Sequence, residues 1–221
     1  HTFSENTHTF HAEKCTACGK CSLVCPTKAM TFVGTPVTDD EIWEEIQKDL
    51  VFYKTSGGGV TISGGEPLYQ PEFTREILKK CRENGIHTAI ETSGFAPAAA
   101  VKSVLAYCDL VLFDIKETDA ENHKKYTGVS SGRILENLKL INELRIPFIL
   151  RLPIIPGINA REEHFRAVKR IAESMQFCKG TEVMPYHILG AYKYELLQTE
   201  YACAGIPEPD DMTILKWKSL V

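Results

Sequence analysis

Residues 53–68 read Tyr-Lys-Thr-Ser-Gly-Gly-Gly-Val-Thr-Ile-Ser-Gly-Gly-Glu-Pro-Leu, and this stretch decides how the rest of the chain is interpreted. The β-branched run 60–62 predicts a short strand, and the pair Gly64-Gly65 follows it with Glu66 next in line. A strand that ends in bare backbone beside a carboxylate suits the close approach of a small ligand that carries an amine or a hydroxyl. A plain turn between a strand and a helix explains this stretch equally well when it is taken alone.

Strand-like and helix-like segments alternate from residue 60 to the C-terminus. The expected strands are 60–63, 87–91, 110–114, 148–152 and 181–184, and the expected helices are 72–84, 97–106, 131–145, 161–175 and one after Pro209. This alternation predicts an α/β fold in which helices cover a parallel sheet or barrel of five strands.

A capping box at Thr38–Glu41 predicts a further helix before this repeat, with Ile42, Ile46 and Leu50 on one face. The start of that helix sets a boundary near Val37. We therefore expect a small cysteine-rich domain at 1–36 and a main domain at 37–221.

Charged and polar side chains collect where each predicted strand ends. Because the C-terminal ends of parallel strands share one edge, where active sites are built, these side chains are expected to meet. Taken singly, Asp114 and Lys116 could be a surface ion pair, Arg151 a structural clamp and His187 a loop histidine. Together they predict a pocket of mixed charge for a ligand with both an ammonium and a carboxylate group. The expected site residues are Gly64, Gly65, Glu66, Glu91, Asp114, Lys116, Arg151 and His187.

The cysteine loop, residues 15–25, reads Cys-Thr-Ala-Cys-Gly-Lys-Cys-Ser-Leu-Val-Cys and is followed by Pro26. This is the spacing of bacterial ferredoxins, whose fourth cysteine serves the other cluster of a two-cluster domain. By that rule one [4Fe-4S] cluster takes the first three thiolates and a second cluster takes the fourth. A zinc knuckle and unligated thiols are the alternatives. The expected metal ligands are Cys15, Cys18, Cys21 and Cys25. The other four cysteines are interpreted as core or surface thiols, namely Cys81, Cys108, Cys178 and Cys203.

Composition narrows the function classes. The chain has 221 residues, of which 43% are hydrophobic and 24% are charged, and its net charge is −4. The mild acidity argues against nucleic acid as the main partner, and no apolar run reaches membrane-spanning length. Eight cysteines, four of them clustered, favour metal ligation in a reducing compartment over disulfides, so we expect a cytoplasmic protein.

These segments together resemble the radical S-adenosylmethionine enzymes that activate glycyl radical enzymes, the pyruvate formate-lyase activating enzyme group. The cysteine loop is similar to the ferredoxin-like insertion of one branch of that family. The likeness covers nearly the whole chain, and the matching segments keep the family order. They are 56–67, 85–94, 109–116, 126–129, 151–157 and 184–187, with Gly190.

The resemblance implies a partial (β/α)6, TIM-like barrel without its first strand, joined to a remnant ferredoxin-like iron–sulfur module at 1–36. It implies S-adenosylmethionine and [4Fe-4S] clusters as cofactors. Gly64, Gly65 and Glu66 would receive the methionyl amino group, and the other site residues would contact the amino, carboxylate and ribose groups. The resulting 5′-deoxyadenosyl radical would take a hydrogen atom from a glycine of a partner enzyme, with a flavodoxin- or ferredoxin-type protein as electron donor.

One part of the family pattern does not occur in these 221 residues, the Cys-x-x-x-Cys-x-x-Cys that holds the radical-generating cluster. Its expected place is before His1, together with the first barrel strand and the first ferredoxin-type cysteine run. We therefore expect a chain truncated at its N-terminus and inactive as it stands. Two alternatives remain, an electron-transfer module with a non-catalytic barrel and a radical S-adenosylmethionine enzyme that acts on a small molecule. Segments 126–129 and 184–187 favour the activating enzyme over the latter.

Overall fold

The computed structural model describes residues 1–5, 7–197 and 199–221, and the chain forms two compact units. The first unit comprises His1–Val37 and Ile188–Gly205, and the second comprises Thr38–His187 and Ile206–Val221. In the described ranges no helix is long and apolar enough to cross a membrane.

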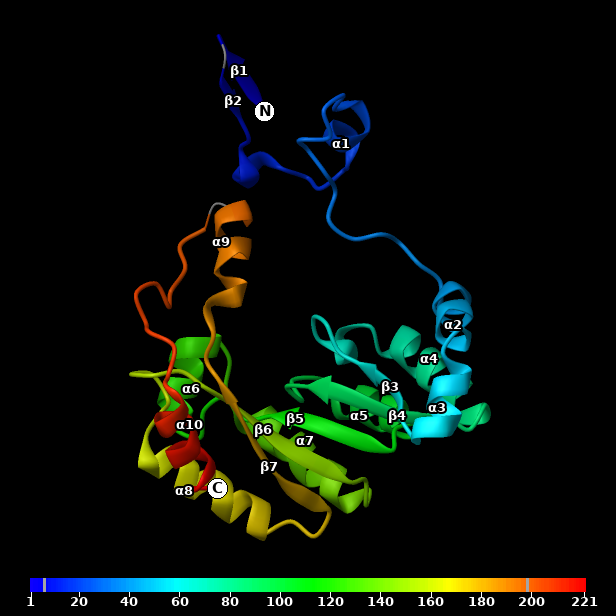
Figure 1. Cartoon of the computed structure of the whole chain (residues 1–221), viewed down its shortest axis with the longest axis vertical. Helices are drawn as coiled ribbons and strands as arrows, with labels where there is room; N and C mark the ends of the chain where they lie inside the picture. Colours follow the sequence, from blue (N-terminus) through cyan, green and yellow to red (C-terminus); the bar gives the residue numbers. More distant parts are fainter. Residues whose placement is uncertain (6, 198) are drawn as a thin grey trace. The chain divides into compact units, whose positions relative to one another are not determined.

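The second unit is built on a five-stranded parallel sheet (Figure 1). Its strands follow one another in space as they do in sequence, and each neighbouring pair is parallel, which confirms the predicted α/β fold with five parallel strands. The strands are β3 (Gly59–Ile62), β4 (His87–Thr92), β5 (Leu110–Asp114), β6 (Phe148–Ile154) and β7 (Cys178–Pro185).

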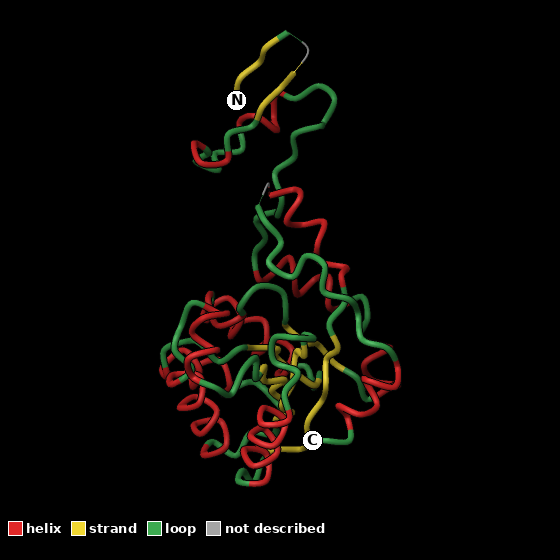
Figure 2. The backbone as a smooth tube through the Cα atoms, turned by 90° about the vertical axis from the view of Figure 1, so that its left-hand side faces the viewer, coloured by secondary structure: helices red, strands yellow, loops and turns green. Residues whose placement is uncertain are grey.

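Helices surround these strands (Figure 2). The capping box forms as predicted, because Glu41 N donates to Thr38 Oγ1 at 3.2 Å and Thr38 N donates to Glu41 Oε2 at 2.7 Å. The helix that it opens ends at Gln47, however, and a separate helix starts at Leu50. A short helix at 120–127 was also not expected from the sequence. The helices of this unit are α2 (Asp39–Gln47), α3 (Leu50–Ser56), α4 (Pro71–Glu83), α5 (Ala98–Leu105), α6 (Ala120–Thr127), α7 (Gly132–Glu143), α8 (Glu162–Glu173) and α10 (Asp211–Lys218), with a 3-10 turn η2 (Pro67–Tyr69).

The two faces of the sheet differ in burial, and this difference orients the site. Along β5 and β6, Val111, Phe113, Leu150 and Leu152 are completely buried in the main core. The residues between them are only half-buried, so they point to the other face. Register places Asp114 beside Arg151 on that half-buried face, at the C-terminal edge of the sheet.

The first unit contains a short antiparallel hairpin of β1 (Thr2–Ser4) and β2 (Thr7–Thr9), in which Thr2 pairs with Thr9. A 3-10 turn η1 (Ala12–Lys14) and α1 (Lys20–Val24) follow, and the later segment contributes η3 (Ile188–Gly190) and α9 (Ala191–Leu197). Neither η1 nor α1 contains a buried residue. That this unit is a ferredoxin-like module stays a prediction.

Candidate functional site

A cavity of about 280 Å³ lies at the C-terminal edge of β3, β4 and β5, and we call it the rim cavity. Parallel strands bring their C-terminal ends together there, so three segments that are distant in sequence contribute to it. Six of the eight predicted site residues line it. The full lining is Ser63, Gly64, Gly65, Glu66, Glu91, Thr92, Ser93, Asp114 and Lys116.

The glycine pair leaves open space at this edge. Gly64 has φ +114, a conformation that residues with a Cβ rarely adopt. A Cβ placed on Gly64 or on Gly65 would have no described atom within 4 Å. The backbone therefore passes close to the cavity without filling it, as a close-fitting ligand site requires.

Glu66 ties the end of β3 to the end of β4. Its Oε1 accepts hydrogen bonds from Thr92 Oγ1 at 2.5 Å and from Leu68 N at 3.2 Å. Its Oε2 accepts from Ser93 N at 3.0 Å and from Ser93 Oγ at 2.6 Å. The carboxylate thus fixes the glycine turn through the hydroxyl groups of Thr92 and Ser93, which no sequence pattern had indicated. Its expected contact with a ligand amine stays a prediction.

Arg151 lies on the same face and forms an ion pair through Nη1 with Glu91 Oε1. The Arg151 side chain is only 13% exposed, and its Nη2 donates to the sulfur of Met184 at 3.3 Å. Ser63 Oγ donates to Glu91 Oε2 at 2.8 Å, so Glu91 of β4 contacts both the residue that follows β3 and Arg151 of β6. The structure therefore brings Arg151 together with the residues that line the rim cavity, although Arg151 itself does not line it.

Asp114 and Lys116 form an ion pair, with 3.1 Å between Lys116 Nζ and Asp114 Oδ2. The carboxylate is mostly buried and the ammonium is half exposed. Behind them the buried Asn159 joins β5 to β6, because its Nδ2 donates at 2.7 Å to the carbonyl oxygens of Lys116 and Pro153. Such a connection between two loops gave no signal in the sequence, since an asparagine in a loop has many possible partners.

A buried cluster fixes the segment that follows Lys116. Both oxygens of Glu117 accept hydrogen bonds from Arg161 Nη2 at 2.8 Å, and Glu117 Oε1 also accepts from two backbone N–H groups of the loop. His164 packs beside this pair, with its Nδ1 2.9 Å from Thr118 Oγ1. Burial lowers the pKa of His164, which favours its neutral form there. The loop that carries Lys116 is therefore held rigidly.

His187 and the four cysteines of the cysteine loop were also predicted to hold ligands. His187 is exposed just after β7 and does not line the rim cavity. Cys15 and Cys18 are exposed, and Cys21 and Cys25 are half-buried. Among the described residues, no group of three or more histidine, cysteine, aspartate or glutamate side chains is close enough to hold a metal ion.

The chemistry of the cysteine loop nevertheless suits metal ligation. A hydrogen bond from the backbone of Lys20 lowers the pKa of Cys18, and one from the backbone of Met30 lowers the pKa of Cys25. Burial instead raises the pKa of Cys81 to about 11 and that of Cys108 to about 12. Both of these thiols lie in the core, as expected from the sequence. The thiolate form that binds metal is thus favoured at Cys18 and Cys25 and disfavoured at Cys81 and Cys108.

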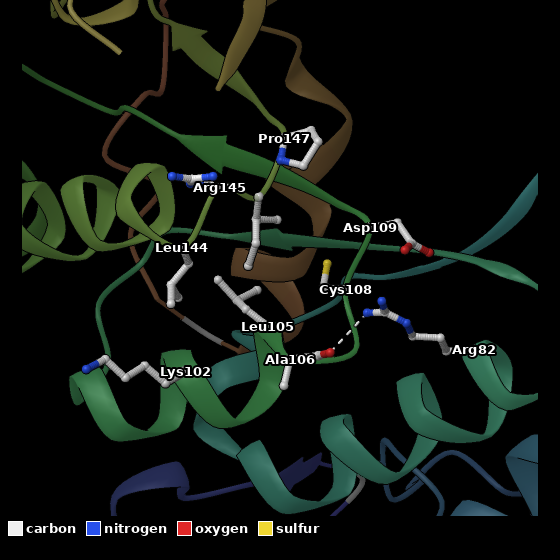
Figure 3. Close-up of a pocket in the computed structure, with 10 residues that line it drawn as sticks. Arg82, Lys102, Leu105, Ala106, Cys108, Asp109, Leu144, Arg145 and Pro147 are labelled. Carbon is white, nitrogen blue, oxygen red and sulfur yellow. Dashed lines mark hydrogen bonds between the residues drawn. The ribbon is translucent and has the colours of Figure 1, made fainter. Parts of the chain in front are cut away.

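A larger cavity, of about 550 Å³, lies at the opposite edge of the sheet (Figure 3). Asp109 and Pro147, which precede β5 and β6, place it at the N-terminal ends of the strands. Arg82, on its wall, donates through Nη1 to the carbonyl oxygen of Ala106 at 3.0 Å (Figure 3). None of the predicted site residues lines this cavity, so the size of a cavity does not identify the site here.

Comparison with known proteins agrees with this geometry. The sequence-family model of the Radical SAM superfamily matches residues 14–168 of this chain. An isethionate sulfite-lyase activating enzyme of Oleidesulfovibrio alaskensis is 42% identical over 190 residues, which cover 84% of this chain and 60% of that protein. The chain thus spans about three fifths of that relative.

Two further matches cover more of the related protein. A choline trimethylamine-lyase activating enzyme of the same organism is 39% identical over 217 residues, which cover 96% of this chain and 70% of that protein. The crystal structure of a domain of pyruvate-formate lyase-activating enzyme from Bacteroides vulgatus superposes with a TM-score of 0.60 at 30% identity. That match covers 74% of this chain and 92% of the other.

Proposed function

This chain belongs to the radical SAM superfamily, among the activating enzymes of glycyl radical enzymes, and we propose that it binds S-adenosylmethionine in the rim cavity. The observation that carries the proposal is the mixed charge of that edge of the sheet. Three carboxylates, on Glu66, Glu91 and Asp114, lie there with the cations of Lys116 and Arg151. S-adenosylmethionine matches this mixture, because it carries an ammonium, a carboxylate, a sulfonium and two ribose hydroxyls.

The chain's own residues would bind and orient the cofactor. The bare backbone of Gly64 and Gly65 would admit its methionyl end, and Glu66 and Glu91 would accept from the ammonium group. Lys116 and Arg151 would pair with the carboxylate, and Asp114 would accept from a ribose hydroxyl. Fixing the charged end in this way restricts the orientation of the reacting bond, which is the main contribution that a protein makes to such a step.

The activity we propose is that of a glycyl radical enzyme activating enzyme. An iron–sulfur cluster, when bound, supplies the electron for reductive cleavage of S-adenosylmethionine, so that a 5′-deoxyadenosyl radical can take a hydrogen atom from a backbone glycine of a partner enzyme. The 221 residues contain no Cys-x-x-x-Cys-x-x-Cys for that cluster. The role of this chain's rim residues is therefore to position the cofactor.

We further propose that the cysteine loop ligates iron–sulfur clusters in a ferredoxin-like module at 1–36. Its spacing and the lowered pKa of Cys18 and Cys25 support this role. Such clusters would receive electrons from a flavodoxin- or ferredoxin-type donor. The clustered spacing of four of the eight cysteines supports a reducing compartment such as the cytoplasm.

Calorimetric titration of this chain with S-adenosylmethionine tests the cofactor site. We expect Lys116→Ala to weaken binding roughly tenfold, because it removes one charge-assisted contact. Lys102→Ala is the matched control, since Lys102 lines the cavity at the opposite edge of the sheet. Equal affinities for the Lys116→Ala variant and the unsubstituted chain would refute the assigned role of Lys116.

The activity itself is measured under anaerobic conditions in the protein expressed from its gene. Reduction in the presence of S-adenosylmethionine should produce 5′-deoxyadenosine, and addition of the partner enzyme should produce the electron paramagnetic resonance signal of a glycyl radical. Binding of S-adenosylmethionine by the protein without its cleavage on reduction would contradict the proposed activity.

A further inference from the structure

A second cavity, of about 250 Å³, adjoins the rim cavity, and we call it the side cavity. The two cavities share Ser93, Asp114 and Lys116, so ligands in both would be neighbours. Another part of its wall comes from α6 and the residues after it, which include the segment 126–129 that resembles the activating enzymes. The remaining lining residues are Phe95, His123, Thr127, Val129 and Ile134.

The ring of His123 is fixed by a hydrogen-bond cluster within this wall. Its Nδ1 lies 3.0 Å from the carbonyl oxygen of Val129 and 3.1 Å from Thr127 Oγ1. The Thr127 hydroxyl donates in turn to the carbonyl oxygen of His123 at 2.7 Å. A carbonyl oxygen can only accept, so the ring proton is on Nδ1, and Nε2 of the neutral ring is an acceptor.

This acceptor remains available to a ligand. His123 is only 3% exposed, and none of the described residues makes a hydrogen bond with its Nε2. In the described part of the chain, the buried side-chain nitrogen and oxygen atoms without a hydrogen-bond partner are Nε of Arg151 and Nε2 of His164. Nε2 of His123 is not among them, so this atom is not completely buried, and because His123 lines the side cavity we infer that Nε2 faces it.

The lining selects the chemistry of the occupant. Asp114 and Lys116, which both cavities share, form an ion pair with each other. The rest of the lining includes Phe95, Val129 and Ile134, whose apolar surface beside His123 favours an uncharged ligand that donates an N–H to the ring. A cavity of this size admits a few small residues of extended chain but no folded element. An extended segment centred on glycine fits, because glycine lets the main chain approach an acceptor without a side chain in the way.

We propose that the side cavity binds the main chain around the target glycine of the partner enzyme, with the glycine N–H donating to Nε2 of His123. This inference rests on the proposed function, since it places the protein substrate beside the cofactor. His123 would act as a substrate-positioning residue through direct contact with the substrate backbone. Thr127 and Val129 would hold its ring in the accepting tautomer.

Two synthetic peptides test the proposal on this chain in the presence of saturating S-adenosylmethionine. One is acetyl-Ala-Ala-Gly-Ala-Ala-amide, and the other carries N-methylglycine at its centre and so lacks the N–H donor. Their affinities are measured by nuclear magnetic resonance titration of the isotope-labelled chain. We expect the glycine peptide to bind about fivefold more tightly, the value of one hydrogen bond.

The substitution His123→Asn isolates the acceptor. An asparagine amide can still donate to the Val129 carbonyl from the position of Nδ1, but it has no counterpart of Nε2. The preference for the glycine peptide should therefore disappear in His123→Asn and persist in Lys124→Asn, an exposed position on the same helix. A preference that survives His123→Asn would come from the bulk of the added methyl group and would overturn the role of His123.

Two further outcomes are decisive. If neither peptide binds while S-adenosylmethionine does, the side cavity is not a peptide site, and the proposed function stands. If S-adenosylmethionine also fails to bind, the proposed function itself is contradicted. Should His123→Asn not fold, the ¹⁵N resonance of Nε2 in the unsubstituted chain decides: it should shift on addition of the glycine peptide, and an unchanged resonance would refute the contact.

Discussion

The C-terminal edge of the sheet and the cysteine loop were both predicted from the sequence to bind ligands. They differ in how far the residues around them are buried. At the sheet edge, Asp114 directly follows Phe113, which is completely buried, and Arg151 lies between two completely buried leucines of β6. In the cysteine loop, α1 has no buried residue, and two of the four thiols are exposed. The core therefore determines where the charged side chains at the sheet edge lie.

The difference shows which sites a folded chain arranges by itself. Strand register and the side-chain hydrogen bonds of Glu66 and Asn159 hold the edge residues in place before any ligand arrives. In the described part of the chain, α1 has no buried residue that could hold the cysteine loop, and metal-binding loops commonly take their final arrangement from the metal. The following predictions test this distinction, from the largest expected effect to the smallest.

Iron binding should depend almost entirely on the cysteine loop. Anaerobic addition of ferrous iron and sulfide should load the chain with iron, and Cys18→Ser should remove most of it, because a serine hydroxyl does not replace a thiolate ligand. Cys203→Ser is the control, since Cys203 lies outside the loop. Iron and sulfide analysis with the visible absorption spectrum gives the result, and equal iron loss in both variants would show that the ligands are misassigned.

Arg151→Ala should have the largest effect on stability at the sheet edge. The change leaves Glu91 without its cation in a partly buried place, so we expect the free energy of unfolding to fall by about 2–3 kcal/mol. Arg166→Ala, which removes an exposed ion pair with Glu162, should cost less than about 1 kcal/mol. Urea unfolding followed by circular dichroism compares the two, and similar losses would mean that the edge is no more preorganised than the surface.

Alanine substitutions at Gly94 and Gly65 should affect different quantities, the first stability and the second ligand binding. Gly94 has φ +72, and a Cβ there would lie 2.5 Å from the Phe113 ring, so Gly94→Ala should cost about 1–3 kcal/mol of stability. Gly65→Ala should leave stability within about 0.5 kcal/mol but weaken S-adenosylmethionine binding, because its methyl group enters open space at the rim cavity. Urea unfolding and calorimetry measure the two quantities. A stable Gly94→Ala variant would contradict the close packing described here.

The smallest expected effect is the pH-dependent contribution to stability of the contact between α2 and α4. Lys80 Nζ lies 2.6 Å from Asp39 Oδ2, and this hydrogen bond lowers the pKa of Asp39. A carboxyl with a lowered pKa in the folded state contributes stability above its unfolded pKa, about 3.9 for aspartate, and loses that contribution as the pH falls through the folded value.

Lys80→Met should therefore lower the melting temperature slightly at pH 7, by roughly 1–3 °C, and have almost no effect near pH 2. Scanning calorimetry at both pH values gives the comparison. Lys79→Met, on the same helix with a long 4.0 Å contact to Glu83, is the control. A difference between Lys80→Met and the unsubstituted chain that is equally large at pH 2 would show that Asp39 is not responsible.

Local pattern explains the parts of the fold that the sequence predicted. Short apolar or β-branched runs, separated by helical segments, predicted five parallel strands, and all five form. The helix break between α2 and α3 was not expected, because Ile42, Ile46 and Leu50 keep one apolar face across it. Periodicity reports the buried face of a segment, but it does not report each turn of its backbone.

The sequence by itself determined the strands, the edge at which the charged side chains meet and the family to which the chain is similar, because each follows from the order and spacing of neighbouring residues. Only the tertiary structure decided that Glu66 binds Thr92 and Ser93, that Asn159 joins two loops and that His123 lines the side cavity. The physical reason is that the partners of a polar side chain are chosen by three-dimensional proximity and by the need to satisfy buried donors and acceptors. Neither condition can be evaluated until the sheet and its helices have brought distant segments together.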